Sequence, residues 1–518
     1  MNSRSGISEK IIYALLAAFT LCMICIHAVR LPFNVFWVDT AFSVDLIRLP
    51  IREMLAATAV NEHPPFYYLF GKFVTTILGD RPASFRATGF IPYLGILILA
   101  HTYVRKHFGI VPAIIITAFA SLTPTSVIYV METRMYELGC FLMLAAFLSM
   151  HQLMCYADER RNGKWILFYF LSMMTAYTHY YLTVAVCILY LSLILFCIVN
   201  RKDIARCMIC SVLAILSYLP WLGVMLKNFG VRAGDWWAEG FSGFDESMCE
   251  IFGLKRFYLP ALFFAAVLVC GKVVESRHIR KKTASGDSAS LTSGDGREKQ
   301  SGSEKPAGRA MLWFLITGIL VIALVMAVGA LVSILVRPLF LSRYVYPLAS
   351  IGWLLFGMGL GSAGEWLAGM IPEDKKKLSF AAKLAPAVVA FLIAAFALKT
   401  FYGVYRDNRD VQRQYSEETA AFLDEVTIPA GSVIYSSIEQ EEFTIAGCYF
   451  PGTDVYIENA LFYYSIPVQD EFYLVWQISA VDVTVQNLDS YGYGCSLIKS
   501  GGTLGLQRDV SILFCKKY

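Results

Sequence analysis

The stretch NEHPPFYYLF, residues 61–70, decides how the rest of this chain is threaded. It places three polar residues and two prolines before an apolar run that reaches about Leu78 and is interrupted by Lys72. A helix that crosses a bilayer needs about 20 mostly apolar residues, so this run is too short for a full span. The sequence therefore predicts a short helix, started by Pro64 and Pro65, that lies at a membrane–water boundary.

Long uncharged segments elsewhere indicate a polytopic helical membrane protein. Of the 518 residues, 57% are hydrophobic and 16% are charged, whereas soluble domains are about 45–50% apolar and about 25% charged. The first apolar run, IIYALLAAFTLCMICIHAV (residues 11–29), is too long for the core of a signal peptide. Because no small-residue cleavage site follows it, we expect a retained anchor.

The distribution of lysine and arginine sets the predicted topology, because these residues favour cytoplasmic loops. With the N-terminus inside, the other basic segments also fall inside only if residues 63–79 are not a span. The basic segments are RKH (105–107), DERRNGK (158–164), NRKDIAR (200–206), the tail after Lys272, and EDKKK (373–377). Residues 30–83 then form one external loop. Eleven spans are predicted, near 11–29, 84–104, 109–131, 134–153, 165–178, 181–199, 206–226, 256–274, 310–335, 344–365 and 380–402.

Residues 1–402 are predicted to be the transmembrane domain, and two further parts of the chain are predicted to lie outside the membrane. Residues 403–518 combine the helical SEETAAFLDEV with strand-like VIYSS, DVYIEN, EFYLVWQI and VSILFCKKY. These patterns, separated by glycine-rich turns, predict a small external α/β domain. Residues 276–309 lack hydrophobic periodicity and are predicted to be a disordered cytoplasmic linker.

Most of the 13 cysteines lie in apolar runs, where cysteine acts as a small hydrophobic residue. Four lie in segments placed outside the membrane: Cys249, Cys448, Cys495 and Cys515. A disulfide among these four is open, but the sequence does not pair them. No cysteine and histidine spacing typical of a metal site is present.

Ionisable residues gather at the outer ends of the predicted spans. They are Asp39, Asp45, Arg48, Arg52, Glu62, His63, Arg86, Glu132, Arg134, Arg337 and Arg343. Such groups cost a few kcal/mol near membrane depth and persist where they pair or act. The planar fork of arginine suits phosphate. The outer rim therefore fits a phosphate-bearing ligand and proton transfer, while the lack of a glycine-rich phosphate loop leaves a soluble nucleotide donor without a site.

Five segments, in this order, carry a resemblance to a known family. They are WVDTAFSVD, NEHPPFYYLF, FRATGF, SVIYVMETRMYELG and RPLFLSRYVYPL. Over about residues 10–360 the chain resembles the GT-C glycosyltransferases of the protein O-mannosyltransferase and lipid A aminoarabinose transferase type (glycosyltransferase family 39). The resemblance implies a GT-C fold with interfacial helices in the first external loop. It also implies inverting transfer of a sugar from a polyprenyl- or dolichyl-phosphate carrier on the outer face.

Several site residues follow from the resemblance. Asp39 matches the family's acidic residue after the first span, which implies a general base. The chemistry needs such a group, because an acceptor hydroxyl is a poor nucleophile until a carboxylate takes its proton. His63, Arg134 and Arg343 match positions near the lipid-phosphate headgroup, where donors would absorb the charge of the leaving group.

The chain departs from the family at one point: Asp39 is followed by Thr40 where many relatives have Asp-Glu. A second carboxylate and a divalent cation therefore stay open, with Asp45 or Glu62 as substitutes. We place Tyr136 and Tyr344 in the substrate site by position beside the arginines Arg134 and Arg343. Aromatic residues also line membrane interfaces without any further role.

Other residues have equally good structural interpretations. Asp45, Arg48 and Arg52 lie on one helix face, so an ion pair within a surface helix competes with a site role. Glu132 is either a loop-end residue or part of the site. His179, in THYY, is interpreted as a polar residue at the end of a span and is left out of the site.

The sequence predicts a hexosyl- or pentosyltransferase in a bacterial plasma membrane with its C-terminal domain outside. Its partners would be a polyprenyl-phosphate-linked sugar, a lipid, glycan or protein acceptor, and membrane lipids, with no nucleic acid. One alternative is a transporter of a lipid or sugar phosphate, although we find no repeated halves. Another is a ligase or polymerase that transfers a lipid-linked oligosaccharide. Donor sugar, acceptor and oligomeric state are not determined.

Overall fold

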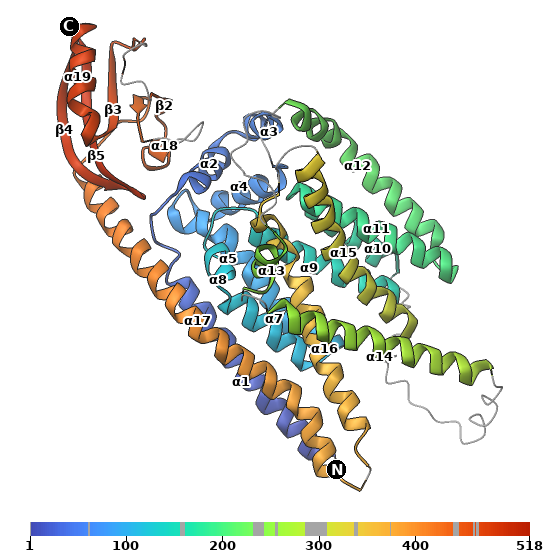
Figure 1. Cartoon of the computed structure of the whole chain (residues 1–518). Coiled ribbons are helices and arrows are strands. Elements are labelled where there is room, and N and C mark those ends of the chain that lie inside the picture. The colour runs from blue at the N-terminus through green and yellow to red at the C-terminus, as the bar shows by residue number, and fades with distance from the viewer. Residues whose placement is uncertain are drawn as a thin grey trace.

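The structure is a computed structural model of the whole chain (Figure 1). It describes residues 2–60, 63–155, 161–231, 243–253, 257–284, 308–335, 340–372, 374–438, 445–458, 462 and 466–518. A body of helices makes up most of the molecule, and a small sheet stands at one end of it. The chain begins at the opposite end, where α16 ends and α17 begins.

The body consists mainly of apolar helices. They are α1 (Asn2–Ala28), α5 (Pro82–Leu99), α7 (Ile110–Leu122), α8 (Pro124–Tyr129), α9 (Tyr136–Cys155), α10 (Arg161–Ala176), α11 (Tyr180–Asn200), α12 (Ile204–Val231), α13 (Phe244–Phe252), α14 (Tyr258–Ala284), α15 (Gly308–Leu335), α16 (Ala349–Gly369) and α17 (Lys376–Asp424). A π-helical turn (Ala100–Val104) leads into α6 (Arg105–Phe108), and a 3-10 turn (Ser342–Leu348) leads into α16. Within the described residues, eight helices are long and apolar enough to cross a membrane. The chain is therefore an integral membrane protein, as predicted.

Each of the eleven predicted spans coincides with helical structure, but the count of eleven is not confirmed. The predicted spans near 109–131, 165–178 and 256–274 fall on helices that are not among the eight. In the first of these, α7 ends at Leu122 and α8 begins at Pro124. The break follows from the sequence, because the residue before a proline is disfavoured in the helical region.

The segment between α1 and α5, predicted to be the first external loop, carries three short helices: α2 (Val38–Arg48), α3 (Ile51–Ala59) and α4 (Phe66–Leu78). The predicted short helix is thus present as α4, with only 13 residues. It buries Tyr67 and Tyr68 and leaves Phe73 and Ile77 exposed. The three helices lie at the end of the body nearest the sheet (Figure 1).

Lys72, which interrupts the apolar run of α4, holds α4 against α2. Its ammonium group donates to the carbonyl oxygens of Ile47, Arg48 and Leu49 at 2.9, 3.3 and 2.6 Å. These are carbonyls at the end of α2, which have no partner within their own helix. A cation at a helix C-terminus also interacts favourably with the helix dipole. Lys72 therefore stabilises the position of α2.

The C-terminal domain contains one five-stranded mixed sheet in the order β2-β1-β3-β5-β4. Its strands are β1 (Val433–Ser436), β2 (Asp454–Ile457), β3 (Glu471–Gln477), β4 (Tyr493–Leu504) and β5 (Gln507–Lys517). β1 pairs in parallel with β2 and β3, whereas β5 pairs antiparallel with β3 and β4. Two helices, α18 (Ile445–Tyr449) and α19 (Val481–Ser490), complete an α/β fold as predicted.

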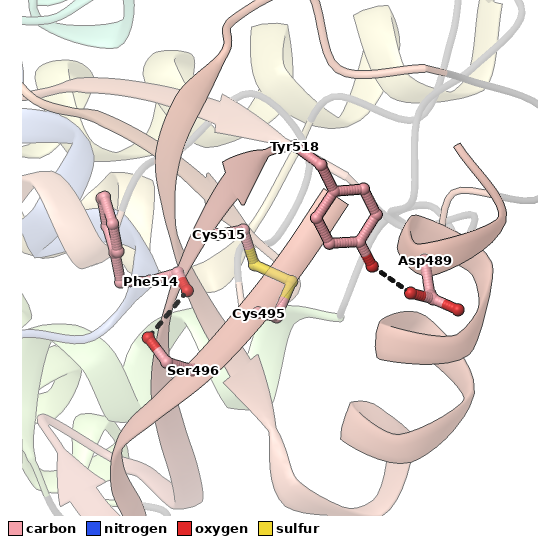
Figure 2. Close-up of a disulfide and its surroundings, with 6 residues drawn as sticks. All are labelled: Asp489, Cys495, Ser496, Phe514, Cys515 and Tyr518. Carbon is pink, nitrogen blue, oxygen red and sulfur yellow. Dashed lines mark hydrogen bonds between the residues drawn. A yellow bond between two sulfur atoms is a disulfide. The ribbon is translucent and has the colours of Figure 1, made fainter. Parts of the chain in front are cut away.

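A disulfide joins Cys495 on β4 to Cys515 on β5, which face each other in the antiparallel register (Figure 2). Close by, the Ser496 hydroxyl donates to the Phe514 carbonyl at 3.3 Å. The Tyr518 hydroxyl donates to Asp489, which ties the last residue to α19. The pairing left open by the sequence is thus Cys495 with Cys515.

The C-terminal domain is anchored on the loop that leads into α2. α17 runs unbroken for 49 residues from the helical body to the sheet, so the predicted boundary between residues 402 and 403 lies inside this helix. The Tyr449 hydroxyl accepts a hydrogen bond from the backbone N–H of Phe36 at 2.9 Å. Arg48 donates to the carbonyl oxygens of Gly447 and Cys448 at 3.0 and 3.2 Å. α18 and α2 are therefore packed as neighbours.

Gly505, in the turn between β4 and β5, provides a test of this anchoring. Its φ is +63°, and a Cβ there would lie 2.6 Å from the Tyr449 hydroxyl and 2.8 Å from the Phe36 carbonyl oxygen. Gly505→Ala is therefore expected to lower the melting temperature of the protein. The left-handed backbone alone costs about 1–2 kcal/mol, and the two close approaches add to this cost.

Gly501→Ala is the matched control, because Gly501 has a φ of +61° but its Cβ would meet only Ile478 at 3.7 Å. Thermal unfolding of both variants in lipid nanodiscs separates backbone strain from the lost docking. Equal decreases in the two variants would contradict the importance of the close approach.

Candidate functional site

Asp39, the second residue of α2, lies between two arginines that are distant in the sequence. Its Oδ2 accepts from Arg343 Nη1 at 3.0 Å, and its Oδ1 lies 3.9 Å from Arg134 Nη2. The Asp39 side chain keeps 20% of its surface exposed, and that of Arg343 keeps 24%. One carboxylate faces two guanidinium groups, so this cluster carries one excess positive charge.

Arg86 of α5 holds the extended segment before α2 through hydrogen bonds from its guanidinium group. Arg86 is 4% exposed, and its guanidinium donates to the carbonyl oxygens of Phe33 at 2.8 Å and Val35 at 3.1 Å. It also donates to the carbonyl of Met131, which lies in the α8–α9 turn that carries Arg134. Arg86 thus brings the start of α2 and the α8–α9 turn together, which accounts for the closeness of Asp39 and Arg134.

Arg134 connects three parts of the site from its buried position in the α8–α9 turn. Nη1 donates to the Asp39 carbonyl oxygen at 3.3 Å and to the Ser43 hydroxyl at 3.4 Å. Nη2 lies 3.1 Å from Nε2 of His63. A guanidinium can only donate, so Nε2 of His63 is the acceptor and the ring proton is on Nδ1.

His63 and His179 form a buried aromatic wall with Tyr344. The ring centroids of His63 and His179 are 5.5 Å apart, and those of His179 and Tyr344 are 5.0 Å apart. Burial and the nearby guanidinium of Arg134 lower the pKa of His63 well below its ordinary value. The same causes lower the pKa of His179 to about 3. Both imidazoles are therefore neutral at pH 7, and the arginines supply the positive charge.

A backbone contact explains how His179 reaches the site. The N–H of Phe66, at the start of α4, donates to the carbonyl oxygen of Tyr177 at 3.0 Å. This contact joins the segment after Pro65 to the turn between α10 and α11. His63 lies shortly before Phe66 and His179 shortly after Tyr177, so this contact brings the two imidazole rings together.

One buried and one partly buried carboxyl group lie beside the arginine cluster. Glu132, 8% exposed, precedes Arg134 in the α8–α9 turn, and Glu250 belongs to α13. Burial raises the pKa of both carboxyls to about 7. For Glu132 the Arg134 guanidinium opposes this shift, and for Glu250 the neighbouring Glu246 adds to it. The Ser342 hydroxyl donates to Glu250 at 3.5 Å.

Glu132→Gln is expected to make the protein more stable at pH 8 and to leave its stability at pH 5 nearly unchanged. The folded-state pKa of about 7 exceeds the ordinary 4.5. The folded state therefore binds more protons between these values, and stability is lost as the pH rises through this window. The difference corresponds to roughly 3 kcal/mol above pH 7.

Melting temperatures measured in nanodiscs at several pH values from 5 to 8 test this expectation. Glu250 contributes in the same direction, so the variant should show a reduced slope and not a flat profile. Glu365→Gln is the control, because Glu365 is exposed on α16. An unchanged slope in Glu132→Gln would show that its carboxyl is charged throughout this range.

The structure brings six of the predicted site residues together: Asp39, His63, Arg134, Tyr136, Arg343 and Tyr344. Tyr136 is buried at the start of α9, with its ring centroid 6.4 Å from that of His179. Asp45 lies apart from this cluster and faces α18, where Cys448 Sγ lies 3.8 Å from its Oδ1. Glu62 is outside the described residues.

Some interpretations of single residues change. Arg48 makes its ion pair with Asp80, at 3.0 Å, and not with Asp45 of its own helix. His179, which the sequence placed at a span end only, is part of the wall beside His63. No sequence motif singles out Glu250, because α13 has only an amphipathic pattern. Arg48 with Asp80, His179 with His63 and Glu250 with Ser342 each join separate elements of the fold. Periodicity along one helix therefore does not reveal these contacts.

Among the residues that the structure describes, no group of three or more His, Cys, Asp or Glu could hold a metal ion. The arrangement has instead a carboxylate within reach of two guanidinium groups, neutral imidazoles and tyrosines. Guanidinium groups form strong, charge-assisted hydrogen bonds with phosphate. The site can therefore hold a phosphate group and a proton acceptor side by side.

Comparison with known proteins agrees with this geometry at the level of fold. No family model matches the chain, and no curated protein sequence matches it. Among solved structures, ArnT from Cupriavidus metallidurans in the apo state is similar, with a TM-score of 0.58, 12% identity and 97% of each chain covered. ArnT bound to undecaprenyl phosphate gives a TM-score of 0.55, 11% identity and the same coverage. The chain therefore has the GT-C fold of these ArnT structures, which confirms the predicted fold class.

Proposed function

We propose that this protein is an inverting glycosyltransferase that moves a sugar from a polyprenyl-phosphate carrier to an acceptor at the outer face of a bacterial plasma membrane. The observation that carries the proposal is the placement of Asp39 against Arg343 and near Arg134. Helix α2, which carries Asp39, lies at one end of the helical body (Figure 1). A solved structure with the same fold was determined with undecaprenyl phosphate bound.

The proposed reaction is a single displacement. The acceptor oxygen forms a bond to the anomeric carbon of the sugar, and the bond from that carbon to the phosphate oxygen breaks. The electron pair leaves with the phosphate, and the acceptor's proton passes to the Asp39 carboxylate. Attack opposite the leaving group inverts the anomeric centre. Asp39 acts as general base, and Arg134 and Arg343 stabilise the charge that develops on the phosphate.

The ion pair of Asp39 with Arg343 offers a way for the phosphate of the sugar donor to activate Asp39 as the base. In the resting site, Arg343 Nη1 donates to Oδ2 of Asp39, so this carboxylate oxygen is already occupied by a hydrogen bond. A phosphate that binds Arg343 competes with Asp39 for that guanidinium. Donor binding would thus free Asp39 to accept a proton only when the leaving group is in place.

The placement of the site outside the cytoplasm has support from the C-terminal domain. The sheet and helices α2–α4 occupy the same end of the molecule, opposite the N-terminus (Figure 1). The sheet contains the Cys495–Cys515 disulfide, and disulfides persist in oxidising compartments such as the bacterial periplasm. A periplasmic domain and a periplasmic site are therefore proposed together.

The test is transfer of a labelled sugar in proteoliposomes that contain purified protein and a polyprenyl-phosphate sugar. Membranes from cells that lack the protein supply the acceptor. A covalent product with one added sugar, found by mass spectrometry, is the expected result. Uptake of the label without a covalent product would instead identify a transporter. A product carrying a whole glycan would identify an oligosaccharide ligase.

A further inference from the structure

Glu137, in the first turn of α9, is a fully buried carboxyl group to which the reaction proposed above gives no part. Its Oε2 accepts a hydrogen bond from the Tyr346 hydroxyl at 2.7 Å. Its Oε1 is buried without a hydrogen-bond partner among the residues that the structure describes, and Glu137 forms no ion pair with any of them. A buried carboxyl without a cation costs free energy, whereas an apolar side chain of similar volume does not. Stability therefore does not account for a carboxyl group at this position.

The hydrogen bond of Glu137 joins the two segments that carry the arginines of the site. Glu137 follows Arg134 by three residues, where the α8–α9 turn leads into α9. Tyr346 follows Arg343 by three residues within one 3-10 turn. The bond thus connects the segment of one guanidinium to the segment of the other, close to both. These are the two guanidinium groups that face Asp39.

The surroundings of Tyr346 fix the hydroxyl group that donates to Glu137. The Ser126 hydroxyl of α8 lies 3.1 Å from that of Tyr346. The ring of Tyr129 packs against Tyr346 with 4.6 Å between centroids, and against Tyr136 with 4.7 Å between centroids. Tyr346 is itself fully buried. The Glu137–Tyr346 bond therefore belongs to a packed unit that continues to Tyr136 at the site.

The docking of α9 on the 3-10 turn does not depend on Glu137 alone. A Cβ at Gly139 would lie 3.1 Å from the Pro347 Cβ, so the two backbones approach closely. The Ser350 hydroxyl, at the start of α16, donates to the Cys140 carbonyl oxygen at 2.9 Å. These contacts hold the two elements together, and the bond of Glu137 adds a directional link near Arg343.

Resting on the proposed function, we infer that Glu137 is a positioning residue that acts through Tyr346 on Arg343. Its hydrogen bond fixes the 3-10 turn against the start of α9, and so sets the place of the Arg343 guanidinium relative to Arg134 and Asp39. The leaving phosphate has to meet both guanidinium groups as its bond to the sugar breaks. A displacement of about 1 Å can lower a rate by about 100-fold, which makes such a link valuable for transfer.

Glu137→Met tests the inference, because methionine has a similar size and no group that needs a hydrogen bond. The Tyr346 hydroxyl keeps Ser126 as a partner. We expect kcat for sugar transfer to fall by about 10- to 100-fold, with the Kd for undecaprenyl phosphate changed by less than about threefold. The melting temperature in nanodiscs should stay the same or rise, because an uncompensated buried carboxyl has been removed.

Glu137→Gln should recover most of the transfer, because its amide oxygen can still accept from Tyr346. Ser350→Ala is the matched control, since it removes another buried hydrogen bond to α9 that does not involve the 3-10 turn. It should leave kcat unchanged. In an Arg343→Gln background, Glu137→Met should lower kcat much less than in the wild-type protein, because the group through which Glu137 acts is absent.

Normal kcat in Glu137→Met would overturn the inference, and so would an equal loss of transfer in Ser350→Ala or in Glu137→Gln. A full additional loss in the Arg343→Gln background would show that Glu137 does not act through Arg343. A lower melting temperature in Glu137→Met would assign the carboxyl to stability instead. All these outcomes require a wild-type protein that forms the covalent product, whereas its absence is the failure of the proposed function.

Discussion

Asp39→Asn is expected to lower sugar transfer by about a thousandfold, within the range of roughly 10²–10⁴ for loss of a general base. The amide keeps the size of the side chain but cannot take the proton of the acceptor. It also removes the negative charge that Arg343 and Arg134 face in the resting site. The variant should therefore bind undecaprenyl phosphate at least as tightly as the wild-type protein.

The measurement combines initial rates of transfer with binding of undecaprenyl phosphate, both in nanodiscs. Asp80→Asn is the matched control, because Asp80 pairs with Arg48 in the same segment between α1 and α5 but outside the site. Transfer above a tenth of the wild-type rate in Asp39→Asn would exclude Asp39 as the base. Weaker phosphate binding would show that Asp39 shapes the site instead of opposing the phosphate charge.

Arg343→Gln is expected to weaken binding of undecaprenyl phosphate by about 10- to 100-fold, since a hydrogen bond to a charged group contributes about 1.5–3 kcal/mol. Transfer should fall further, because the same guanidinium stabilises the charge on the leaving phosphate. Arg343→Lys should recover part of the binding, because lysine keeps the charge but lacks the planar fork.

Arg52→Gln is the control for this series, because Arg52 is exposed on α3 at the same end of the molecule. Titration with undecaprenyl phosphate gives the Kd for each variant, and steady-state rates give the effect on kcat. If Arg343→Gln bound the phosphate as well as Arg52→Gln does, the leaving group would have to be held elsewhere.

The main features of the fold could be predicted because they follow from local patterns. Charge counting around the short run after Pro65 identified α4 as a helix too short to span, and the structure gives it 13 residues. Four strands were predicted from alternating or continuous apolar residues. β4 was missed because Gly494, Gly501 and Gly502 resemble a turn, and its pairing with β5 contains register irregularities. Tertiary pairing overrides low strand propensity at such positions.

The site could be predicted only in part. The resemblance supplied Asp39, His63, Arg134 and Arg343, and the structure brings all four together. It did not supply His179, whose role depends on the contact between the start of α4 and the α10–α11 turn.

The sequence by itself determined that the chain is a membrane protein, which run is too short to span, and which acidic and basic residues lie in its polar loops. These properties depend on composition and spacing over tens of residues. Only the tertiary structure decided that Arg343 contacts Asp39 across 304 positions, that Lys72 holds the end of α2, and that Cys495 pairs with Cys515. Such contacts result from the packing of whole helices and strands, and no local periodicity encodes which distant residues will meet.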